Sequence, residues 1–299
     1  MRKIVITGSN GLLGQTLVNL LLKEPLKYQA IGFSRGINRS ERDDFKYVTV
    51  DITDKSQLFK NLIEYQPDVI VNTAAMTNVD ACEENKQACD LLNIESVKYL
   101  KEYSEENNTH LIHLSTDFIF DGKKEFYKET DAPNPLSYYG LSKLKSEEIL
   151  TKSKIDYTIL RTTLVYGKVF DMTRNNIVLW VRKMLSEGKE ITIVADQYRM
   201  PTYVEELALA CKLSIDKKAI GIFNVSSSTL LSIYEIAQQI AEVFELDKSL
   251  IQPISTATLN QKAPRPPKTG FDLSTSIKSL GIKPKSFKED LQLFKDNLI

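Results

Sequence analysis

The chain of 299 residues carries 39 Lys and Arg against 39 Asp and Glu, so its formal net charge is zero. This balance argues against nucleic acid or a membrane surface as partner, because proteins that bind either normally carry a basic excess. The longest apolar runs are far too short to cross a bilayer, and we expect no signal peptide because a strand pattern begins within the first residues. We expect a cytoplasmic protein with one large α/β domain and a smaller partner domain.

Cysteine and histidine are scarce. Cys82, Cys89 and Cys211 cannot form an even disulfide framework, and only His110 and His113 supply imidazole. We expect reduced, buried thiols and structural histidines, and no metal site.

The first predicted strand, residues 3–7, runs into a glycine-rich loop and then a helical pattern over 16–23. Gly8 suits a tight turn, Gly11 lets backbone N–H groups approach a pyrophosphate, and Gly14 lets the helix pack closely on the strand. This order predicts a dinucleotide site. The loop residues predicted to bind the cofactor are Gly8, Asn10, Gly11, Leu12 and Leu13.

The second predicted strand, residues 29–35, ends without the acidic residue that binds the ribose 2′-OH of NAD. It ends instead in Ser34 and Arg35, a hydroxyl and a guanidinium that suit a 2′-phosphate. The sequence therefore favours NADP(H), while one arginine leaves the use of NAD(H) open.

The third and fourth predicted strands, 47–50 and 68–71, also end in candidate cofactor contacts. Asp51 and Ile52 could bracket an adenine, and Ala74 and Ala75 allow a flat ligand to lie against the backbone. Strands alternating with helices indicate a doubly wound parallel sheet of the Rossmann type.

A long helix is predicted over 83–107, interrupted on its apolar face by Asn93, which is expected to satisfy backbone groups or join a proton relay. The fifth predicted strand, 111–114, is followed by Thr116. At the strand end Thr116 could hydrogen-bond a reacting oxygen, or its hydroxyl could simply close a turn.

A helix predicted from residue 138 carries Tyr139 and Lys143 on one face. A free tyrosine is a poor acid near neutral pH, but a neighbouring ammonium should lower the pKa of the phenol. The pair could then donate a proton to a carbonyl oxygen.

The remaining elements are predicted as strands over 157–165, 191–194 and 222–225 and helices over 177–185, 202–213 and 233–244. We expect residues 1–166 to form the dinucleotide-binding domain, joined by a return segment near 202–226. Residues 167–201 and 227–299 then form a discontinuous substrate-binding domain. Arg199, Arg265 and Lys268 are cations that could reach a nucleotide diphosphate.

The motifs TGSNGLLG, NTAA, LSTD, YYGLSK and LVYG, in this order, resemble those of the extended short-chain dehydrogenase/reductases. NTAAMTNVD, STDFIFDG, YGLSKLKSEE, ADQYRMPTY and RPPKTGFDLS are similar to motifs of the dTDP-4-dehydrorhamnose reductases within that family. The resemblance extends nearly to the C-terminus.

The resemblance implies NADPH-dependent reduction of a 4-keto nucleotide sugar, dTDP-4-dehydro-L-rhamnose, to dTDP-L-rhamnose. It implies that Tyr139 donates a proton, Thr116 holds the carbonyl oxygen, and Lys143 binds the nicotinamide ribose. Members of the extended family often form dimers, so a homodimer is one expectation. The resemblance also implies a set of residues that contact the substrate. The expected substrate contacts, including the two arginines, are Val79, Asp80, Asp117, Phe118, Arg199 and Arg265.

Two positions depart from the reductase pattern. Leu164 stands where these enzymes often carry a tryptophan, and Arg199 stands where they carry a glycine. In carrying an arginine at that point, the chain resembles the regulatory β subunit of methionine adenosyltransferase. An NADP-binding regulatory subunit, or an epimerase or dehydratase of the same fold, therefore stays an alternative.

Overall fold

The computed structural model describes residues 1–172, 175–259 and 261–298. Its largest sheet has seven parallel strands in the order β12-β7-β5-β4-β1-β2-β3. This is the doubly wound sheet that the sequence predicts. Its strands are β1 (Arg2–Thr7), β2 (Tyr28–Ser34), β3 (Lys46–Thr49), β4 (Val69–Asn72), β5 (His110–Thr116), β7 (Tyr157–Thr162) and β12 (Gly221–Val225).

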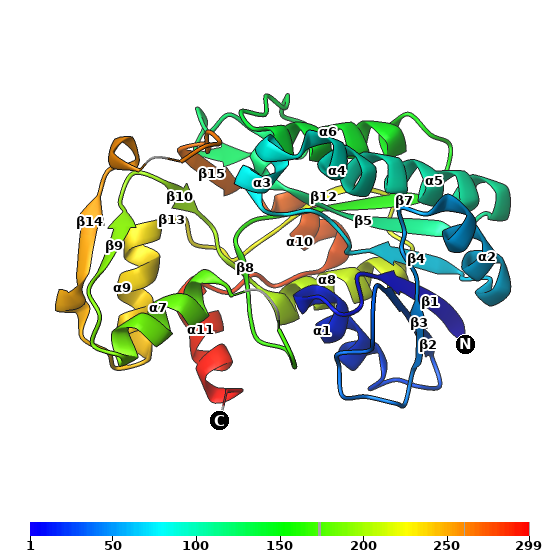
Figure 1. Cartoon of the computed structure of the whole chain (residues 1–299), viewed down its shortest axis with the longest axis horizontal. Coiled ribbons are helices and arrows are strands. Elements are labelled where there is room, and N and C mark those ends of the chain that lie inside the picture. The colour runs from blue at the N-terminus through cyan, green and yellow to red at the C-terminus, as the bar shows by residue number, and fades with distance from the viewer. Residues whose placement is uncertain (173–174, 260, 299) are drawn as a thin grey trace.

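Helices cover both faces of this sheet (Figure 1). Apolar side chains of α1 (Leu12–Leu21), α8 (Val204–Lys217) and α10 (Ser274–Leu280) pack on one face. Those of α2 (Lys55–Tyr65), α5 (Ser96–Asn107) and α6 (Tyr138–Thr151) pack on the other. Central strands read as continuous apolar runs because both of their faces are buried.

Several segments from the C-terminal half of the chain build a second lobe, at the left of Figure 1. Its core lies between α7 (Ile177–Ser186), α9 (Ile233–Val243) and α11 (Phe287–Asp296). Beside them are the strand pairs β9 (Ile191–Val194) with β14 (Ile251–Ile254) and β8 (Val165–Tyr166) with β11 (Thr202–Tyr203). A four-stranded sheet joins β13 (Leu231–Ser232), β10 (Tyr198–Arg199), β15 (Lys268–Phe271) and β6 (Phe126–Tyr127).

The predicted single helix over 83–107 is wrong. The segment forms α3 (Val79–Glu84), α4 (Lys86–Asp90), a π-helical turn (Leu91–Glu95) and α5. Asn85 leaves helical geometry and its side chain caps the next helix, accepting from the amide of Ala88 at 2.9 Å. The π-helical turn directs Asn93 inward, where its Oδ1 accepts from the amide of Met76 and its Nδ2 donates to the hydroxyl of Ser142. Asn93 thus ties the loop after β4 to α6.

The predicted strand over 157–165 is also too long. β7 ends at Thr162, and Leu164 adopts a left-handed backbone with φ of 42° before β8 begins. The turn sends the chain out of the main sheet toward the second lobe. Among the helices of the described residues, none is long and apolar enough to cross a membrane.

Candidate active site

A cavity of about 850 Å³ opens at the carboxyl ends of β1, β2, β4 and β5. Ligands bind at this edge in open α/β sheets. Every residue predicted from the sequence for cofactor binding or catalysis lines this one cavity. They are Gly8, Asn10, Gly11, Leu12, Leu13, Ser34, Arg35, Asp51, Ile52, Ala74, Ala75, Thr116, Tyr139 and Lys143.

The glycine loop between β1 and α1 packs so closely on neighbouring backbone that side chains at Gly8 and Gly14 would not fit. Gly8 has a φ of 67°, and a Cβ there would lie 2.9 Å from the amide nitrogen of Ala74. A Cβ on Gly14 would lie 2.3 Å from the carbonyl oxygen of Gly8. Gly11 caps α1 without a side-chain acceptor, which leaves the first amides of that helix free to meet an anion. These residues fit a dinucleotide pyrophosphate.

Beyond β2 the cavity mouth carries two guanidinium groups. Arg35, predicted from the sequence, is largely exposed and lies 4.0 Å from the carboxylate of Asp51. Arg39 lines the same cavity and was missed by the sequence analysis. Its Nε lies 3.8 Å from the carboxylate of Asp171. The available signal was a second arginine four residues after Arg35, before the next strand.

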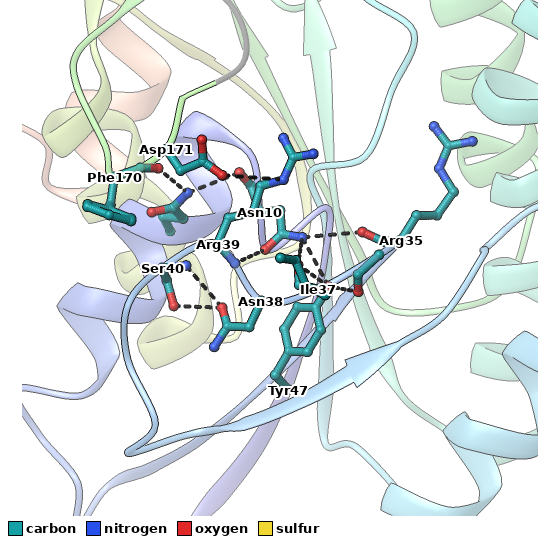
Figure 2. A network of polar contacts seen from close by, with 11 residues as sticks. Asn10, Arg35, Ile37, Asn38, Arg39, Ser40, Tyr47, Phe170 and Asp171 are labelled. Atoms are coloured by element: carbon teal, nitrogen blue, oxygen red, sulfur yellow. Dashed lines mark hydrogen bonds and ion pairs between the residues drawn. The ribbon is translucent and has the colours of Figure 1, made fainter.

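Asn10 shapes this mouth through its side chain (Figure 2). Its Nδ2 donates to the carbonyl of Ile37 at 2.8 Å and to the hydroxyl of Tyr47 at 3.0 Å. Its Oδ1 accepts from the amide of Arg39 at 3.0 Å. The loop that presents both arginines is therefore fastened to the glycine loop.

Thr116, Tyr139 and Lys143 meet at the inner end of the cavity, brought there by β5 and α6. The hydroxyl of Thr116 accepts from the amide of Phe118 at 3.3 Å, as in the predicted turn, and donates to Asp117 at 3.1 Å. The ring of Phe118 meets the ring of Tyr139 edge-on, with centroids 5.7 Å apart. The three predicted catalytic groups thus share one wall.

The phenol of Tyr139 does not have the lowered pKa that the sequence predicts. Burial raises the pKa of Tyr139 above its ordinary value, opposed by hydrogen bonding with Thr116. Burial also lowers the pKa of Lys143 to about 8. The Nζ of Lys143 lies 3.0 Å from Nε2 of His113, so it faces inward rather than toward the phenol.

The residues predicted to contact substrate divide into two groups. Val79, Asp117 and Phe118 line the cavity, as does Leu164 at the position of the family's tryptophan. Asp80, Arg199 and Arg265 are not among the lining residues in the described part of the chain.

The two predicted arginines are engaged elsewhere. Arg199 is buried, with its Nε 3.3 Å from Asp117, and its other nitrogens donate to the carbonyls of Tyr198 and Pro266. Arg265 forms a bidentate pair with Asp80, at 3.1 and 2.7 Å. Arg199 carries no free N–H fork for a diphosphate, whereas Arg265 clamps α3 to the loop before β15. Lys268 pairs with Glu125.

Metal ligands do not gather at the site. Across residues 1–172, 175–259 and 261–298, no three His, Cys, Asp or Glu side chains could hold a metal ion together.

Comparison with known proteins agrees with this geometry. dTDP-4-dehydrorhamnose reductase of Aggregatibacter actinomycetemcomitans is 30% identical over 305 aligned residues, covering 98% of each chain. Methionine adenosyltransferase 2 subunit beta of Bos taurus is 29% identical, covering 94% of this chain and 83% of the relative. The crystal structure of dTDP-4-dehydrorhamnose reductase from Bacillus anthracis in complex with NADP superposes with a TM-score of 0.89 at 28% identity, covering 99% of each chain. The RmlD substrate binding domain family matches residues 1–299, and the chain belongs to this family.

Proposed function

We propose that the protein catalyses NADPH-dependent reduction of a 4-keto nucleotide sugar, with dTDP-4-dehydro-L-rhamnose as substrate and dTDP-L-rhamnose as product. The observation that carries the proposal is the shared cavity, in which the phenol of Tyr139 and the glycine loop line one space. Family membership and the NADP-bound reductase structure support it. NADPH, when bound, supplies the hydride.

The residues of the chain divide the remaining work. Tyr139 donates the proton to the sugar carbonyl oxygen, and Thr116 holds that oxygen. Lys143 binds the nicotinamide ribose hydroxyls, and its charge, once turned toward the cleft, lowers the pKa of the phenol. Arg35 and Arg39 hold the 2′-phosphate, which favours NADPH over NADH.

The sugar nucleotide occupies the part of the cavity next to Tyr139. Val79, Asp117 and Phe118 face it directly. The other three predicted residues, Asp80, Arg199 and Arg265, act indirectly. Arg265 holds Asp80 in place. Arg199 pairs with Asp117, which is hydrogen-bonded to Thr116.

Oxidation of NADPH should be measured with a panel of 4-keto nucleotide sugars that differ in base and sugar. Turnover with the dTDP-linked 4-keto-6-deoxy sugar and loss of the signal without sugar are the expected results. Turnover confined to another sugar would replace the substrate and keep the reaction class.

A second candidate is an NADP-binding regulatory subunit. Arg199 at the glycine position and the likeness to methionine adenosyltransferase 2 subunit beta favour it. NADPH binding without oxidation by any sugar of the panel would select this candidate over the reductase.

A further inference from the structure

Lys143 rests against a buried imidazole. Among the described residues its Nζ has one hydrogen-bond partner, Nε2 of His113 on β5, at 3.0 Å. Lys143 and His113 are only 2% and 1% exposed, so the contact is buried. Whether the contact stabilises an ammonium or an amine depends on which imidazole nitrogen carries the proton.

Asn72 on β4 fixes that proton. Its Oδ1 lies 2.6 Å from the hydroxyl of Thr7, a length typical of O–H···O and short for N–H···O. The amide oxygen therefore faces Thr7, and the amide nitrogen faces Nδ1 of His113 at 3.1 Å. Because Asn72 donates there, Nδ1 must accept, and the proton of the neutral imidazole sits on Nε2.

The Nε2–H of His113 points between two atoms. One is the hydroxyl oxygen of Ser146 at 2.9 Å, which accepts because its own proton goes to the carbonyl of Lys143 at 2.6 Å. The other is Nζ of Lys143. A neutral amine can accept from this N–H, but an ammonium has only donors and would oppose it.

The nearby charges raise the pKa of Lys143 by less than burial lowers it. Glu147 on α6 raises the pKa of Lys143, but its carboxylate is bound by Arg161 of β7 at 2.7 and 3.0 Å. Cys89 of α4 also favours the ammonium, and Tyr139 is neutral. Burial of the amine outweighs both contributions.

We propose that His113 is a positioning residue, held by Asn72 as the Nε2–H tautomer, which disfavours the ammonium of Lys143 at its inner position. The charged Lys143 is thereby directed toward the cleft, where ribose hydroxyls offer acceptors. The inference rests on the proposed cofactor role of Lys143 and needs no sugar substrate.

Imidazole ¹⁵N NMR of the unliganded protein tests the tautomer directly. The chain has only two histidines, so a His110→Gln variant assigns both sets of signals. We expect His113 to keep the Nε2–H tautomer from about pH 6 to pH 9. An Nδ1–H tautomer or an imidazolium in that range would overturn the inference, with no variant of the network required.

Asn72→Asp should reverse the tautomer, because a carboxylate accepts from Nδ1–H and turns Nε2 toward Lys143 as an acceptor. The NADPH affinity of the unmodified protein should weaken above about pH 8, where Lys143 loses its proton. In Asn72→Asp the pH at which the NADPH affinity begins to fall, here called the onset, should move up by about one pH unit or more. Ser146→Ala, which keeps the Asn72 contact, should leave the onset in place.

Two results would contradict the inference in this second experiment. One is a reversed tautomer with no change in the pH dependence of NADPH affinity. The other is an equal shift in Ser146→Ala. Failure of the proposed function would appear separately, as an absence of sugar turnover with these binding and NMR results intact.

Discussion

The ionisable side chains are buried at the inner end of the cavity and exposed to solvent at its mouth. At the inner end Tyr139 and Lys143 are buried, and burial moves both of their pKa values away from ordinary. At the mouth the side chain of Arg35 is 74% exposed and that of Arg39 is 37% exposed. Water screens the charges of the arginines, whereas Lys143 and the Thr116 hydroxyl at the inner end are buried against specific partners. Substitutions should therefore have much larger effects at the inner end.

Tyr139→Phe should have the largest effect. Loss of a positioned acid should lower turnover by roughly 10²–10⁴, while NADPH affinity changes little. NADPH oxidation and fluorescence titration measure the two quantities. Tyr138→Phe is the matched control, because the Tyr138 hydroxyl bonds Asp90 at 2.8 Å and is not among the lining residues in the described part of the chain. Equal losses in both variants would remove Tyr139 as the acid.

Lys143→Met should inactivate the protein and stabilise it. The pKa of Lys143 is lowered from 10.5 to about 8 in the folded state, so the native chain binds fewer protons than the unfolded chain between these values. The free energy of unfolding then rises with pH across that window, and below it the buried ammonium costs stability. The variant should gain roughly 1–3 kcal/mol at pH 7, and less as pH approaches 10.

Urea unfolding at several pH values measures this gain. Arg35→Met, the control at the mouth, should change stability by less than about 0.5 kcal/mol because its charge is solvated. A Lys143→Met variant less stable than the unmodified protein at pH 7 would break the contrast between the two ends.

Arg39→Ala and Arg35→Ala should have the smallest effects. Each should weaken NADPH by about fivefold, near 1 kcal/mol for an exposed charge pair, and NADH hardly at all. The loss should shrink at high salt. Arg42→Ala is the control, since Arg42 pairs with Asp44 and is not a lining residue among those described. An equal loss of NADH affinity would discard the 2′-phosphate role.

Much of the site was predictable because its residues follow strand ends. Parallel strands bring their carboxyl ends to one edge, so Thr116 at the end of β5 and the glycine loop after β1 had to lie near each other. The helical spacing of Tyr139 and Lys143 fixed their common face. The π-helical turn at Asn93 was missed because side-chain contacts with Met76 and Ser142, far away in the sequence, decide it. The break at Asn85 had a local signal that was overlooked, because its side chain caps the helix that follows.

The sequence by itself determined the sheet type, the order of the predicted cofactor contacts and the three catalytic candidates, since each depends on local pattern and strand order. Only the tertiary structure decided how the ionisable groups are used. Burial and long-range partners turned Lys143 toward His113, engaged Arg199 with Asp117, and brought Arg39 to the mouth. The protonation state of an ionisable side chain depends on its burial and its partners. Segments far apart in the sequence supply both, so a local sequence pattern does not predict them.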